Sequence, residues 1–110
     1  MSEDNRRRFP RLDVPLYYRS GGLFGPRQRA RNVSRGGIRV ETDDALRVGT
    51  RLEVELFLPG GDSFSIDVRV AWIRELASQD SAFEAGLEFL ELDAVHRALL
   101  ERCLADHQID

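Results

Sequence analysis

The chain has 110 residues, of which 42% are hydrophobic and 32% are charged, and these are ordinary values for a single globular domain. Its formal net charge is only -3, no apolar run approaches the roughly 20 residues that cross a bilayer, and the start MSEDNRRRF is too polar for a signal peptide. Cys103 is the only cysteine, which excludes an internal disulfide and fits a reducing compartment, so we expect a cytoplasmic protein without membrane insertion.

The first predicted element, residues 1–11, is a polar arm without hydrophobic periodicity. The arm is part of a basic region: residues 1–39 contain ten arginines and three acidic residues. Residues 40–110 contain six arginines and sixteen acidic residues. This division predicts an anionic partner for the N-terminal part. Apart from Phe9, the arm has no apolar side chain to fix it to the rest of the chain, so we expect it to be mobile without a ligand.

Residues 12–92 are predicted to form six or seven short antiparallel strands that close into a barrel. Apolar and charged residues alternate in RLEVELFL (residues 51–58), which indicates a half-buried strand. Alternation continues in SFSIDVRVAW (residues 63–72), where it places Trp72 in the core beside Val68 and Val70. Because Trp72 ends its strand, its indole edge is also a candidate for stacking on a ligand base.

Residues 93–110 are predicted to form a C-terminal helix after the last strand, FEAGLEFLEL. Asp93 is a suitable N-cap, and the helix is expected over residues 94 to about 106. Its apolar residues follow helical spacing and should cover one mouth or side of the barrel; they are Val95, Leu99, Leu100, Cys103 and Leu104.

Two short motifs lie in the basic part of the chain. The first is an RxxxR spacing formed by Arg7 and Arg11, and the second is an NxSxxG spacing in the stretch NVSRGG, residues 32–37. Arginine forks bind phosphate oxygens and match the O6 and N7 edge of guanine. The second motif is a turn in which Gly36 or Gly37 should supply positive φ and let the backbone approach a ligand. Together they predict one shared ligand.

The two motifs at this separation, on an all-β pattern with a final helix, resemble the PilZ domain family over about residues 5–105. The resemblance implies a six-stranded antiparallel barrel and a bacterial receptor for the second messenger cyclic di-GMP. It also implies relay to a downstream protein in motility, pilus or exopolysaccharide machinery.

Carried over to this chain, the family motifs assign the ligand-binding residues. The arginines clamp phosphates and guanine edges, while the Asn and Ser contact a guanine and a nearby phosphate. Arg6 and Arg8 flank the first motif and resemble members that bind an intercalated pair of cyclic di-GMP molecules. The candidate site residues are Arg6, Arg7, Arg8, Arg11, Asn32, Ser34 and Gly37, with Arg35, Gly36 and Trp72 as further candidates.

Other functions remain open at this point. One is a PilZ-like interaction module that binds no nucleotide, against which the intact motifs argue. Another is a small nucleic-acid-binding barrel, which the acidic strand faces after residue 40 disfavour. His96, Cys103 and His107 suggest a metal site by spacing, but capping, solvation and core packing explain them better. No catalytic constellation is present, so we expect neither an enzyme nor a cofactor.

Overall fold

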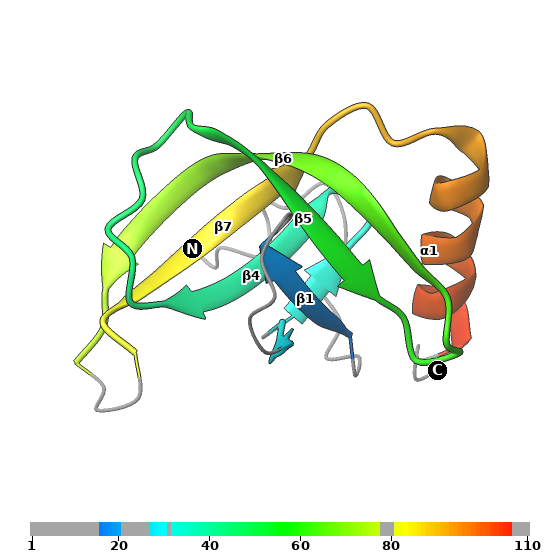
Figure 1. The fold of residues 1–110 in the computed structure, drawn as a ribbon, viewed down its shortest axis with the longest axis horizontal. Coiled ribbons are helices and arrows are strands. Elements are labelled where there is room, and N and C mark those ends of the chain that lie inside the picture. The colour runs from blue at the N-terminus through cyan, green and yellow to red at the C-terminus, as the bar shows by residue number, and fades with distance from the viewer. Residues whose placement is uncertain (1–15, 21–26, 31, 78–80, 107–110) are drawn as a thin grey trace, which may run out of the picture.

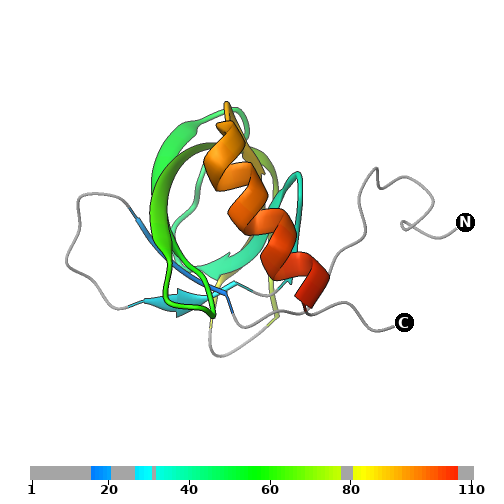
Figure 2. The ribbon, with the colours of Figure 1, turned by 90° about the vertical axis from the view of Figure 1, so that its right-hand side faces the viewer.

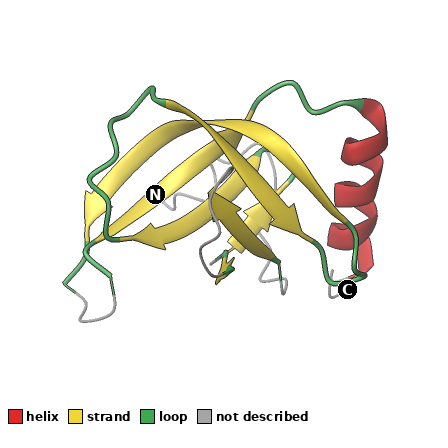
Figure 3. Ribbon diagram, viewed as in Figure 1, coloured by secondary structure: helices red, strands yellow, loops and turns green. Residues whose placement is uncertain are grey.

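A computed structural model of the chain describes residues 16–20, 27–30, 32–77 and 81–106. These residues form strands and one C-terminal helix (Figures 1 and 3). The strands are β1 (Tyr17–Ser20), β2 (Gln28–Arg29), β3 (Asn32–Ser34), β4 (Gly37–Thr42), β5 (Arg51–Phe57), β6 (Ser63–Glu75) and β7 (Phe83–Phe89), and the helix is α1 (Ala94–Asp106). Within the described part of the chain, no helix is long and apolar enough to cross a membrane.

The strands form one antiparallel sheet in the order β2-β1-β5-β6-β7-β4-β3. Its two edge strands, β2 and β3, are separated by only two residues in the sequence. The sheet therefore has to roll up so that its edges come close together, and Figure 2 shows the resulting ring with α1 lying across it. The structure confirms the predicted antiparallel β-barrel with a C-terminal helix.

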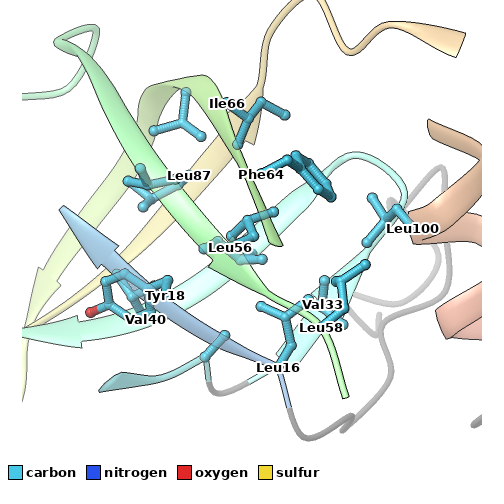
Figure 4. Packing of buried hydrophobic residues seen from close by; sticks show 14 of the residues in the cluster. Leu16, Tyr18, Val33, Val40, Leu56, Leu58, Phe64, Ile66, Leu87 and Leu100 are labelled. Carbon is cyan, nitrogen blue, oxygen red and sulfur yellow. The ribbon is translucent and has the colours of Figure 1, made fainter. Parts of the chain in front are cut away.

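Strand alternation fills the barrel interior, as the sequence predicts. On β5, Val54 and Leu56 are buried, while Glu53 is exposed. On β6, the apolar residues at alternate positions from Phe64 to Val70 are buried in the same way. Figure 4 shows these side chains meeting residues from β1, β3, β4, β7 and α1 inside the barrel. Burial of each large aliphatic side chain contributes roughly 1.5–3 kcal/mol to folding.

Tyr18 links two strands that are not neighbours in the sheet. Its ring lies in the core, and its hydroxyl on β1 lies 3.2 Å from the Glu41 carbonyl oxygen on β4 and 3.1 Å from Gln28 Oε1. Burial raises the pKa of Tyr18 to about 12, and the negative charges of Asp44 and Glu41 add to this rise. The hydroxyl thus remains a donor in the folded protein at pH values where an exposed tyrosine ionises.

We expect Tyr18→Phe to lower the free energy of unfolding by roughly 1 kcal/mol at neutral pH, because the Glu41 carbonyl loses a hydrogen bond. In the wild type, the unfolded chain loses the Tyr18 proton above its ordinary pKa of 10.0, whereas the folded chain keeps it until about 12. The free energy of unfolding of wild type should therefore fall as the pH rises from about 10 to about 12, and it should fall less in Tyr18→Phe. Urea unfolding across alkaline pH measures this, with Tyr17→Phe on the exposed face of β1 as control; identical pH profiles for Tyr18→Phe and the wild type would contradict it.

Helix α1 begins as predicted, because the Asp93 carboxylate accepts a hydrogen bond from the His96 amide at 2.8 Å. Its buried residues are Leu100, Cys103 and Leu104, and burial together with the Asp106 charge raises the pKa of the Cys103 thiol. The expectation that Val95 joins this stripe is wrong, since it is 69% exposed. His96 takes that place, and its ring stacks on Phe64 with the centroids 4.4 Å apart.

Candidate functional site

The NxSxxG residues lie on a tight hairpin between β3 and β4. Ser34 pairs with Gly37, so Arg35 and Gly36 form a two-residue turn. The Ser34 hydroxyl oxygen accepts a hydrogen bond from the Gly36 amide at 3.2 Å, and the Gly36 carbonyl accepts one from the Phe89 amide at 2.9 Å. Ser34 is only 3% exposed, so its oxygen has a structural role in the turn in addition to any contact with a ligand.

Gly37 lets β4 approach β7 closely. A Cβ atom at this position would lie 2.1 Å from the backbone oxygen of Leu87, which cannot rotate away. Among the described glycines, positive φ occurs at Gly49 and Gly61, so the expectation that Gly36 or Gly37 supplies it in this turn is wrong. The motif glycine is needed because the two strands leave no room for a side chain.

The hairpin presents Asn32 on the outer face of the barrel, within a row of residues that crosses four strands. Asn32 pairs with Arg39 on β4, Arg39 pairs with Gly86 on β7, and Gly86 pairs with Trp72 on β6. Neighbouring strands lie about 4.8 Å apart, so the row spans roughly 14 Å. We call the row Asn32, Arg39, Gly86 and Trp72 the outer row.

Trp72 is on the outer face because β6 contains a β-bulge between Val70 and Trp72. The extra residue reverses the alternation, so that Ile73 rather than Trp72 packs toward the core. The prediction that Trp72 is a core residue is therefore wrong. Its half-buried indole covers Gly86, where a Cβ atom would lie 2.2 Å from the indole Nε1. Because Gly86 has no side chain, the indole can pack directly on the β7 backbone at this position.

A buried carboxylate lies beside the outer row. The Glu84 side chain is 6% exposed, and its Oε1 accepts a hydrogen bond from Arg74 Nε at 2.7 Å and lies 2.5 Å from Arg74 Nη2. Glu84 Oε2 lies 3.1 Å from Arg39 Nε. The Arg39 N–H is not aligned for a hydrogen bond, so this second contact is an ion pair set by distance alone. Strand alternation predicted that Glu84 would face water, and nothing in its local sequence indicates its distant partner Arg39.

The hairpin turn also contacts the C-terminal helix. Arg35 Nη1 donates a hydrogen bond to Glu101 Oε2 on α1 at 3.1 Å. Both side chains are about half exposed, so this ion pair adds little stability. It nevertheless places one candidate ligand-binding residue against α1.

A cleft beside α1 is a poor alternative site for an anionic ligand. It is lined by four carboxylates together with Ser65, Ile66, Leu90, Leu92 and His96; the acidic residues are Glu53, Asp67, Glu91 and Asp93. Like charges would repel a phosphate there. Among the described residues, no group of three or more His, Cys, Asp or Glu side chains is arranged to hold a metal ion.

The structure brings together part of the predicted site. It places Asn32, Ser34 and Gly37 on one hairpin and puts Trp72 on the same outer face. The predicted arginines of the arm lie outside the described residues; they are Arg6, Arg7, Arg8 and Arg11. Sequence reasoning missed Arg39, Arg74 and Glu84, because their contacts depend on how β6, β7 and β4 pair in the sheet, which the sequence alone does not show.

A family model for the PilZ domain matches residues 5–106. The chain belongs to the PilZ domain family. No curated protein matches the chain closely enough to add a relative.

Solved structures agree with the PilZ fold. The inhibitor of motility MotI/DgrA from Bacillus subtilis is 25% identical with a TM-score of 0.69, over 92% of this chain and 51% of that chain. YcgR from Escherichia coli, in complex with c-di-GMP, is 23% identical with a TM-score of 0.71, over 92% of this chain and 45% of that chain. The isolated PilZ domain of YcgR with c-di-GMP is 21% identical with a TM-score of 0.67, over 93% of this chain and 91% of that chain. This chain thus spans about half the length of the first two proteins.

Proposed function

We propose that this PilZ domain is a receptor for cyclic di-GMP, which it binds on the outer face of β3, β4, β7 and β6. The observation that carries the proposal is that the NxSxxG hairpin and Trp72 present one continuous outer face. Its width of roughly 14 Å suits a ligand with two bases joined by a phosphate ring. Similarity to structures that contain c-di-GMP supports the choice of ligand.

In this proposal, each group has a role that its chemistry allows. Arg7 and Arg11 clamp phosphate oxygens and the edge of a guanine through bidentate hydrogen bonds. Asn32 and the Ser34 hydroxyl contact a guanine and a nearby phosphate from the hairpin. The Trp72 indole offers a flat face for stacking a base.

The signal is relayed through the arm. Ligand binding joins the arginines of residues 1–11 to the hairpin, which orders the arm and changes the surface that the domain presents to a downstream protein. The domain itself is not an enzyme. With four arginines available, Arg6 and Arg8 provide the charge for a second, intercalated cyclic di-GMP molecule.

The proposal predicts saturable binding of cyclic di-GMP to the purified chain, with a ligand-to-chain ratio of one or two by calorimetric titration. A single-stranded oligonucleotide is the necessary control, because β1 and β5 have a basic and aromatic outer face that could bind nucleic acid. There, the guanidinium carbons of Arg27 and Arg19 lie 3.9 and 5.2 Å from the centre of the Phe57 ring. If the titration with cyclic di-GMP shows no binding, the alternative of a PilZ-like interaction module that binds no nucleotide is supported. Oligonucleotide binding that cyclic di-GMP does not displace would support a nucleic-acid-binding barrel.

A further inference from the structure

We propose that Glu84 is a positioning residue for the cyclic di-GMP surface: it fixes the side chains of Arg74, beside the Trp72 indole, and of Arg39, across Gly86 from Trp72. This inference rests on the proposed function and extends the binding surface to residues that neither sequence motif contains. It concerns the end of the outer row that lies away from the NxSxxG hairpin.

The first step is the burial of Glu84. A carboxylate that is 6% exposed loses most of its hydration, and burial is tolerated only when cations and hydrogen-bond donors replace the water. Arg74 supplies a charge and a hydrogen bond and Arg39 supplies a charge, from the strands on either side, with nitrogen atoms 2.5 to 3.1 Å from the two carboxylate oxygens. Because breaking either contact leaves a buried charge poorly compensated, Glu84 restrains both arginine side chains.

The second step is the position of the two arginines. Arg74 is opposite Glu84, two residues after Trp72, and its guanidinium carbon lies 6.0 Å from the centre of the indole ring. Its side chain is 63% exposed, so the N–H groups that Glu84 does not use can reach a ligand on the indole. Arg39 lies in the outer row between Asn32 and Gly86. Arg74 thus borders the indole, and Arg39 lies across Gly86 from Trp72; one carboxylate contacts both cations.

The third step is the consequence for binding. An unrestrained arginine loses side-chain entropy when it binds a phosphate or a guanine edge, whereas an arginine that is already held in place loses less. Glu84→Gln keeps the shape of the side chain but removes its charge, and its amide nitrogen would face a guanidinium group. We therefore expect about tenfold weaker binding of cyclic di-GMP, comparable to one lost charge-assisted hydrogen bond.

The test is a double-mutant cycle with Glu84→Gln, Arg74→Gln and the double variant, in which cyclic di-GMP affinity is measured by calorimetry. Trp72 is the only tryptophan, so its fluorescence reports base stacking in each variant. We expect wild-type fluorescence to change on ligand addition and each single variant to bind about tenfold more weakly. The double variant should lose less affinity than the two single effects together, because both substitutions remove the Arg74–Glu84 contact. Glu55→Gln is the matched control, since it breaks a half-buried pair with Arg19 at 2.6 Å on β5 and should leave affinity unchanged.

The outcomes separate the inference from the proposed function. If wild type binds cyclic di-GMP but Glu84→Gln binds within about twofold of it, Glu84 has no positioning role. If the two single effects add in the double variant, Glu84 does not position Arg74, and the inference that it holds both arginines is wrong. If Glu84→Gln does not fold, Arg74→Lys decides, because it keeps a positive charge beside the buried Glu84 carboxylate but loses the planar guanidinium group, and unchanged affinity would overturn the inference. If wild type itself does not bind cyclic di-GMP, the proposed function fails instead.

Discussion

Replacing Gly37 with alanine should lower the free energy of unfolding by about 3 kcal/mol, which is at the upper end of the usual effect of overpacking. The added Cβ atom would lie 2.1 Å from the Leu87 backbone oxygen and 3.2 Å from the Glu88 Cα atom. Both obstacles are backbone atoms, so no change of rotamer relieves the overlap. The β4 and β7 strands would have to separate at the hairpin, which would also disturb Ser34.

Urea unfolding followed by circular dichroism measures this effect. Gly60→Ala is the matched control, because nothing lies within 4 Å of a Cβ atom there and its φ is not positive. We expect that variant to unfold within about 0.5 kcal/mol of wild type. Equal stability of the two variants would show that β4 and β7 can adjust to a side chain at Gly37.

Replacing Arg7 and Arg11 together with alanine should weaken cyclic di-GMP binding at least about 100-fold while leaving thermal stability unchanged. Each arginine can form charge-assisted hydrogen bonds that contribute roughly 1.5–3 kcal/mol, so losing two forks removes several kcal/mol of binding free energy. Calorimetry measures the affinity. Thermolysin cleavage beside Phe9, which the ligand should slow in wild type but not in the double variant, measures the ordering of the arm.

Two further variants separate charge from geometry. Arg11→Lys keeps the positive charge but loses the planar fork, so we expect most of the affinity to be lost. Arg47→Ala removes an exposed arginine from the loop between β4 and β5 and should bind like wild type. If the Arg7 and Arg11 double variant binds cyclic di-GMP as tightly as wild type, the arm is not part of the binding site, and the proposed relay through the arm is wrong.

The sequence predicted the parts of this fold that depend on local pattern. The alternation in β5, the N-cap Asp93 and the helix that follows it are each set by residues close together in the chain, and the structure confirms them. The family could also be predicted, because both motifs are short and complete. Whether Arg7 and Arg11 reach the hairpin stays a prediction, since they lie outside the described residues.

The errors have a common physical origin. Val68, Val70 and Trp72 alternate regularly in the sequence, and the bulge that turns Trp72 outward is determined by pairing with β7, which starts 11 residues later. Glu84 looked solvent-exposed because the arginines that bury it come from β4 and β6. Val95 and His96 are neighbours in the first turn of α1, and only the position of Phe64 decides which of them faces the barrel.

The outer row runs across the strands rather than along one of them, and this has a mechanical consequence. Distances along the row are fixed by backbone hydrogen bonds between strands, which vary much less than side-chain rotamers do. A bound molecule therefore meets a template of constant dimensions. In the proposed complex, adjustment has to occur in side chains and in segments outside the sheet, because the sheet itself keeps its dimensions.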